Sequence, residues 1–202
     1  FFHPIADTII AREDRDRSMA AVRDAIRHQF NDQATQRVIY TESHDEVSNG
    51  RQRVPEMIWP GNAASYYAKK RSTLGAAIVM TSPGIPMLFQ GQEFLEDGWF
   101  AAERPLDWGK AGRFGGIVTL YRDLIRLRRN WYDNTRGLRG DHVNVYHVNE
   151  ADKVIAYHRW AVGGPGDGGR SDDRSPHRRG GHTGGSGTRP HDPRGGAAHR
   201  SD

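Results

Sequence analysis

The sequence predicts an α/β fold with short parallel strands, followed by antiparallel β structure and a disordered tail. Three observations carry this prediction. Segments with apolar residues at helical spacing alternate with short apolar runs that suit buried parallel strands. Polar and acidic residues directly follow two of these runs. Near residue 140 the apolar pattern changes to strict alternation, and beyond residue 163 apolar residues almost vanish.

Polar side chains beyond strand ends indicate how this fold would carry a site. A β/α barrel builds its site from side chains at the C-terminal ends of parallel strands, and a complete eight-stranded barrel needs about 250 residues. The chain has 202 residues and continues into another pattern after residue 140, so we expect part of a (β/α)8 TIM barrel.

The first predicted helix spans residues 13–30. Its apolar face consists of Met19, Val22, Ile26 and Phe30. Asp14 or Asp16 would lie near its N-cap, and Asn31-Asp32 would end it. The apolar run at 37–40 then predicts a buried strand.

A long loop at 46–62 separates this strand from a second helix at 63–80. The apolar stripe of that helix is predicted to use Tyr67, Leu74, Ala77 and Ile78. The turn at 82–84 stops the helix. The next buried strand is 85–89, with Pro86 at its start because proline fits poorly inside a central strand.

The third helix is predicted at 117–129. Its apolar face consists of Ile117, Leu120, Leu124 and Leu127. Residues 142–148 and 153–160 alternate in polarity and are joined by the turn at 149–152, which indicates a β-hairpin.

The chain divides into three predicted regions. Residues 1–138 are a partial catalytic barrel, residues 139–162 begin a C-terminal β domain, and residues 163–202 are disordered. The last region holds half of the chain's glycines and no aromatic residue. Because this change is so abrupt, we hypothesise that the residues from about 167 result from a reading-frame error.

Composition excludes several classes of function. The chain has no cysteine, so it has neither disulfides nor thiolate metal sites. No apolar run is long enough to cross a membrane. Residues 1–10 do not resemble a signal peptide and begin without methionine, a hint that the sequence starts within a domain. We expect a cytoplasmic protein without membrane contact, and the sequence gives no indication of its oligomeric state.

Nucleic-acid binding is not expected either. The net charge of +4 is mild, and no basic face with interleaved aromatic residues is evident. The Arg/Gly-rich tail could act as an RNA-binding segment, but it lacks aromatic residues for base stacking.

The densest group of side chains able to take part in catalysis or binding follows the first predicted strand. It consists of Glu42, His44, Asp45 and Glu46. Carboxylates beside an imidazole suit acid/base work or the recognition of sugar hydroxyls. Along a strand, Glu42, His44 and Glu46 would point one way and Asp45 the other, unless a turn brings His44 and Asp45 together. The alternatives are a solvated charged loop or a histidine bonded to a carbonyl. As a metal pair, His44 and Asp45 lack a third ligand, so no metal site is predicted.

Three segments resemble a known family. Residues 38–46 (Val-Ile-Tyr-Thr-Glu-Ser-His-Asp-Glu) resemble the fourth signature region of the alpha-amylase family, which follows barrel strand seven. Residues 84–93 resemble the strand-eight motif, and residues 104–108 resemble the segment after it in branching enzymes. The Ser-His-Asp-Glu form is similar to that of 1,4-alpha-glucan branching enzymes. The resemblance covers about residues 13–160 and implies barrel strands of about six to eight.

The resemblance implies roles for individual residues. Asp45 matches the third catalytic carboxylate, which stabilises the transition state, and His44 matches the histidine that hydrogen-bonds the sugar. Glu93 matches a recurrent acidic position without a catalytic role. Further substrate contacts are expected from Glu42, Glu46, Arg51, Trp59 and Trp99.

The implied reaction cleaves an alpha-1,4 link of glycogen, amylose or amylopectin and transfers the chain to a 6-hydroxyl by a retaining mechanism, without a cofactor. Its nucleophile and general acid follow strands four and five in the family, and no segment here matches them. The acids Glu13, Asp14 and Asp16 fall at a predicted helix start. We therefore expect the isolated chain to be inactive. The alternatives are a fragment of a glucan hydrolase and a non-catalytic glucan-binding protein.

Aromatic residues in the predicted loops have two interpretations. Trp59, Trp99, Phe100 and Trp108 are either platforms for sugar rings or a cover for the barrel top. Tyr121, Trp131 and Trp160 are expected in the core. Arg51 and Arg53 either line the site mouth or are simply solvated.

Overall fold

A computed structural model describes residues 1–163. Its elements follow in the order α1 (Phe2–Ile10), η1 (Asp14–Asp16), α2 (Met19–Arg27), η2 (Ala34–Gln36), β1 (Val38–Ile39), α3 (His44–Ser48), α4 (Val54–Ile58), α5 (Tyr66–Thr81), β2 (Ile85–Pro86), η3 (Gln92–Phe94), α6 (Gly109–Arg113), α7 (Gly115–Arg128), η4 (Arg136–Arg139), β3 (His142–Asn149) and β4 (Val154–Trp160). The predictions of a disordered tail and of a reading-frame error fall, apart from Gly163, outside the described residues.

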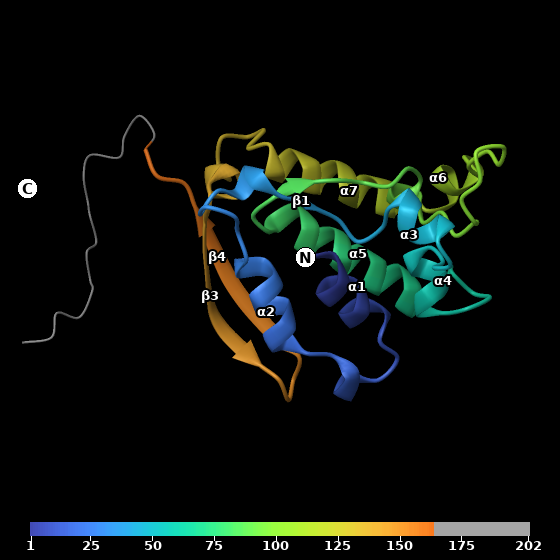
Figure 1. Cartoon of the computed structure of the whole chain (residues 1–202). Coiled ribbons are helices and arrows are strands. Elements are labelled where there is room, and N and C mark those ends of the chain that lie inside the picture. Colours follow the sequence, from blue (N-terminus) through green and yellow to red (C-terminus); the bar gives the residue numbers. More distant parts are fainter. Residues whose placement is uncertain (164–202) are drawn as a thin grey trace, which may run out of the picture. The chain divides into compact units, whose positions relative to one another are not determined.

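Strands β1 and β2 form a parallel pair, and α5 lies between them in the chain (Figure 1). The amides of Ile85 and Met87 donate to the carbonyls of Arg37 and Ile39, at 2.8 and 2.9 Å. Pro86 lies between these two donors, at a position where the ladder to β1 needs no amide. The strands are therefore where the sequence predicted them, but each is shorter than predicted. They are also less buried than expected, since Val38 and Ile85 are exposed.

Helix α2 is shorter than the predicted helix because its N-cap is Ser18, whose hydroxyl accepts from the amide of Ala21 at 3.1 Å. Asp14 and Asp16 lie in η1 instead, and the C-cap is His28 rather than Asn31-Asp32. The buried face consists of Met19, Val22, Ala25 and Ile26, whereas Phe30 is exposed.

Helix α5 buries a different face from the one predicted. Tyr67 and Leu74 are exposed, and the buried residues are Ala68, Ser72, Gly75, Ala76, Val79 and Met80. A Cβ on Gly75 would lie only 2.9 Å from the Ile9 side chain of α1, which shows how closely α1 approaches. The face is built from small residues because α1, α4 and α7 all pack against this helix.

Four α-helices within residues 1–163 were not predicted, namely α1, α3, α4 and α6. Residues 2–10 form α1, with Phe2, Ile5, Ala6 and Ile9 buried at helical spacing. The predicted loop at 46–62 contains the end of α3 and the whole of α4. Helix α7 was predicted correctly to within two residues at its start, and its Tyr121 and Leu124 pack against Ala76 and Met80 of α5.

The predicted hairpin is present as β3 and β4, with an irregular register between Val145 and His147. One face packs on the apolar cluster that α1 and α2 share, through Val143, Val145, Val148, Ile155 and Tyr157. Figure 1 shows this hairpin alongside α2. Of the three aromatic residues expected in the core, only Tyr121 is buried. Trp160 is half-exposed on the outer hairpin face, and Trp131 is exposed after α7.

Candidate functional site

The site begins where β1 ends. Ser43 caps α3, because its hydroxyl accepts from the amide of Glu46 at 3.3 Å. His44 and Asp45 therefore occupy the first turn of a helix rather than a strand. The strand-like alternation considered for Glu42, His44 and Glu46 is wrong, since β1 stops at Ile39.

The turn brings His44 and Asp45 together at the surface. Nε2 of His44 lies 3.1 Å from Oδ1 of Asp45, and the two side chains are 63% and 73% exposed. The edge of the His44 ring approaches Phe100, with ring centroids 6.1 Å apart. The accessible carboxylate can accept hydrogen bonds from sugar hydroxyls, and the imidazole can donate one to them.

Glu42 points inward, contrary to the expectation that it binds substrate. The Glu42 and Arg53 side chains are 2% and 1% exposed, and Nη1 of Arg53 lies 3.2 Å from Oε2 of Glu42. The amide of Val54 donates to Oε1 at 2.9 Å. Burial raises the pKa of Glu42, while Arg53 and the Val54 amide oppose that rise. Both carboxylate oxygens are thus used by protein groups, and the interpretation of Arg53 as a solvated side chain is wrong.

The same pair connects the two strand ends. The Arg53 guanidinium lies over the Phe89 ring, 3.8 Å from its centroid, in the segment after β2. Nearby, Nε2 of Gln92 donates to Oγ1 of Thr41 at 2.6 Å. These contacts hold the segment after β1 against the segment after β2.

A second buried network shapes the loop after β2. Glu96 accepts from the amides of Asp97 and Gly98, each at 3.0 Å, from the amide of Asp107 at 2.9 Å and from Lys110 at 2.8 Å. Burial alone would raise the pKa of Glu96, but these donors outweigh burial and lower it to about 2. Lys110 also contacts Asp97. Sequence reasoning missed both networks, since residues 11 and 14 positions apart give no periodic signal.

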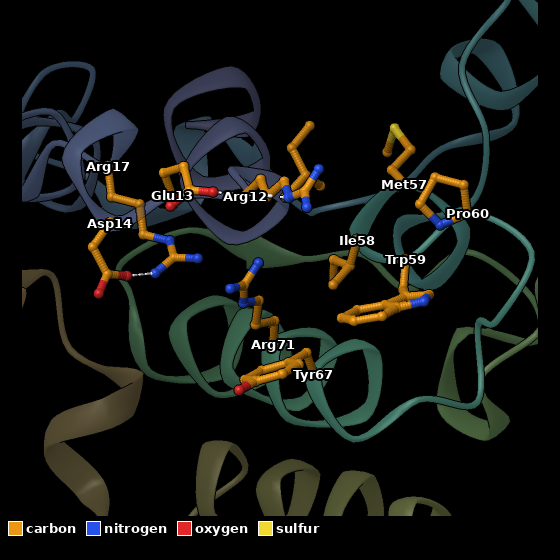
Figure 2. Close-up of a pocket in the computed structure, with 11 residues that line it drawn as sticks. Arg12, Glu13, Asp14, Arg17, Met57, Ile58, Trp59, Pro60, Tyr67 and Arg71 are labelled. Atoms are coloured by element: carbon orange, nitrogen blue, oxygen red, sulfur yellow. Dashed lines mark hydrogen bonds and ion pairs between the residues drawn. The ribbon is translucent and has the colours of Figure 1, made fainter.

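The remaining predicted contacts lie in different places. Arg51 pairs with Glu46 at 3.2 Å and with Asp7 at 3.6 Å. Trp99 is exposed, and it lines a small hollow with Phe100 beside Arg53 and Glu96. Trp59 lies elsewhere, in a cleft that none of these residues lines (Figure 2).

Residues 1–163 contain no group of three or more His, Cys, Asp or Glu side chains arranged to hold a metal ion. No helix in this part of the chain is long and apolar enough to cross a membrane.

No protein-family model matches the chain. A 1,4-alpha-glucan branching enzyme of Paramagnetospirillum magneticum is 37% identical over 89 residues, covering 43% of this chain and 12% of the enzyme. One from Mycolicibacterium paratuberculosis is also 37% identical, over 94 residues. The chain thus matches only a small part of these relatives' length.

Two solved structures of a pullulanase also resemble the chain. A pullulanase from Anoxybacillus sp. LM18-11 superposes with a TM-score of 0.54 at 26% identity, covering 77% of this chain and 25% of the pullulanase. Its complex with maltotetraose superposes with a TM-score of 0.51 at 27% identity.

By its fold and by these similarities, the chain is related to the alpha-amylase-family glycoside hydrolases. The resemblance inferred from the two strand-end motifs is confirmed, and the curated relatives are 1,4-alpha-glucan branching enzymes.

Proposed function

We propose that this chain supplies part of the alpha-glucan site of a 1,4-alpha-glucan branching enzyme. The observation that carries the proposal is the exposed His44–Asp45 pair, which directly follows a parallel strand and lies beside the loop from the next strand. In this proposal β1 and β2 correspond to barrel strands seven and eight, the chain begins near strand six, and the hairpin starts the C-terminal β domain.

Asp45 holds sugar hydroxyls in the transition state, and His44 donates a hydrogen bond to the sugar at the cleaved link. Hydrogen bonds that tighten as the ring becomes oxocarbenium-like contribute several kcal/mol. Phe100 lies beside this pair, and Trp99 precedes it in the same loop as a further aromatic residue. Glu46 and Arg51 line its edge as a mutual ion pair, and Glu42 with Arg53 positions the loop without touching glucan.

Turnover needs two further carboxyl groups, a nucleophile and a general acid about 5 Å apart. Asp14 and Asp16 lie in η1, and Glu13 precedes it, so these acids do not follow a strand. We therefore propose that the 202-residue chain does not transfer glucan by itself. The reaction of the whole enzyme would cleave an alpha-1,4 link of glycogen, amylose or amylopectin, form a glycosyl-enzyme intermediate and pass the chain to a 6-hydroxyl, in the cytoplasm and without a cofactor.

A glucan hydrolase is the second candidate, because the superposing structures are pullulanases rather than branching enzymes. The two differ in whether water or a sugar hydroxyl accepts the chain. A non-catalytic glucan-binding protein would use the same exposed groups without turnover.

The test combines an activity assay with a binding measurement. Purified chain is incubated with amylose, and branching and hydrolysis are measured beside Asp45→Asn. We expect neither product from either protein. Maltotetraose titration followed by NMR should shift the His44 and Phe100 signals, and Asp45→Asn should weaken that binding about tenfold, or about 1.4 kcal/mol.

The control is Asp123→Asn. It removes an exposed carboxylate of α7 that is not part of the proposed site, and it should leave binding unchanged. Activity that Asp45→Asn abolishes would contradict the proposed inactivity, because a nucleophile and an acid would then be present. Binding that Asp45→Asn leaves intact would contradict the role of Asp45.

A further inference from the structure

A cleft of about 870 Å³ lies between the end of α1, the segment 12–17, the end of α4 and the first turns of α5. None of its lining residues belongs to the segments that carry the His44–Asp45 pair or the loop after β2. Its volume falls within the range of ligand sites, which is about 300–1,000 Å³. The cleft is therefore a separate place on the molecule that is large enough for a small ligand.

One side of the cleft is a pair of stacked aromatic rings. The Trp59 and Tyr67 rings are nearly parallel, with an interplanar angle of 6° and centroids 6.0 Å apart. The residues remain 45% and 51% exposed. Figure 2 shows the Trp59 and Tyr67 rings side by side, with the Arg71 side chain rising above Tyr67. The Tyr67 ring lies alongside the indole in a nearly parallel plane, so Trp59 presents an accessible apolar surface next to a second aromatic ring.

The other side of the cleft is polar and well braced. Arg17 and Arg71 both donate to the carbonyl of Ala11, at 2.7 and 2.9 Å, and so hold the segment after α1 against α5. Arg17 pairs with Asp14, and Glu13 pairs with Arg12 at 3.8 Å. The Asp14 and Glu13 side chains stay 74% and 55% exposed, so their carboxylates keep acceptor capacity for a ligand.

The charges on this side indicate which ligand fits. Three guanidinium groups face two carboxylates, so the wall carries one net positive charge and offers both hydrogen-bond donors and acceptors. A phosphate or another anion would be attracted by the arginines but opposed by Glu13 and Asp14, and it would leave these carboxylates without a hydrogen-bond donor from the ligand. A neutral ligand that has an apolar ring face and a rim of hydroxyls satisfies the stacked rings, the guanidinium donors and the carboxylate acceptors together.

We propose that this cleft is a second alpha-glucan-binding site, separate from the His44–Asp45 site, in which a glucosyl ring stacks on Trp59 while its hydroxyls bond Asp14, Glu13 and Arg71. The choice of glucan rests on the proposed function. The site would hold a remote part of the same chain, or another chain, and so raise the local concentration of glucan near Asp45.

The test uses the ¹⁵N-labelled 202-residue chain and maltotetraose as the probe. We expect the indole N–H signal of Trp59 to shift on titration. Trp59→Ala should weaken this binding about tenfold, because the stacking contact is lost. Trp59→Phe should restore most of it, since a ring remains, and Asp14→Asn should weaken binding without touching the ring. The matched control is Trp131→Ala, which removes an exposed indole outside the cleft.

The outcomes separate this inference from the proposed function. If His44 and Phe100 signals shift while Trp59 does not, the second site is overturned and the first stands. If neither set shifts, the proposed function fails. If Trp59→Ala abolishes the shifts at His44 as well, the two places form one site and the separation is wrong. Inorganic phosphate that shifts Trp59 more strongly than maltotetraose would overturn the choice of a neutral sugar.

Discussion

At the scale of residues, the buried Glu42–Arg53 pair is the most demanding contact of the candidate site. Arg53→Met leaves Glu42 buried without its cation, and breaking such a pair costs about 3–5 kcal/mol. We expect that loss in the free energy of unfolding, measured by urea denaturation. Arg51→Met breaks a partly exposed pair with Glu46 and should cost about 1 kcal/mol or less. Equal losses in the two variants would contradict the role given to Glu42.

Glu96 predicts a pH dependence of the loop after β2. Its pKa is lowered to about 2, so the carboxylate is favoured more strongly in the folded chain than in the unfolded one. The stability that it contributes is present above pH 4.5, the ordinary value for glutamate, and is lost as the pH falls toward 2. We expect amide signals of Gly98 and Asp107 to lose protection from hydrogen exchange over that range.

Glu96→Gln is the control for this pH dependence. It should remove the acid-dependent step and leave the loop less protected than in the unchanged chain above pH 4.5. A step that persists in Glu96→Gln would show that another group, such as Asp97, carries it.

At the scale of elements, Gly84 sets how closely β2 approaches β1. Its φ of +142° disfavours other residues, and a Cβ there would lie 2.6 Å from the Ile39 side chain. Gly84→Ala should therefore destabilise the chain by roughly 1–3 kcal/mol. Gly116→Ala in α7 meets no atom within 4 Å and should be neutral or stabilising by up to about 1 kcal/mol. Thermal unfolding of both variants checks the contrast, and a harmless Gly84→Ala would contradict it.

Sequence patterns found several elements whose burial is made by large residues, although α1, which buries Phe2, Ile5 and Ile9, was missed. Helix α2, helix α7 and the hairpin repeat apolar residues at their own period, so their positions were predictable. The buried face of α5 was not, because its contacts are made by Ala68, Gly75 and other small residues. Helices α3 and α4 have five residues each, too few turns for a periodic pattern.

The candidate site was predictable to the same limited extent. His44 and Asp45 were singled out because they follow a strand, and they do lie together. The inward turn of Glu42 depends on Arg53 and Phe89, which reach it only through the fold. Trp59 was grouped with Trp99 because both lie in loops, yet it stacks on Tyr67 of α5.

At the scale of the whole molecule, the described part of the chain exposes a small parallel sheet. Parallel sheets are normally covered on both faces, but Val38 and Ile85 are exposed here. We expect the chain to self-associate as its concentration rises, measured by sedimentation velocity, and Val38→Lys to reduce that association. Val162→Lys changes an exposed valine outside the strands and should have no effect. Equal behaviour of both variants would place the contact elsewhere.

Pro86 gives this sheet a preferred direction of growth. The amides of Ile85 and Met87 donate to β1. The backbone nitrogen of residue 86 therefore faces the opposite edge of β2. A proline there has no hydrogen to offer. An incoming strand that docks beside β2 finds one donor fewer, a difference of about 0.5–1.5 kcal/mol per missing bond. Extension of the sheet is therefore more favourable beside β1, and the pyrrolidine ring of Pro86, which closes on the backbone nitrogen, limits widening on one side only.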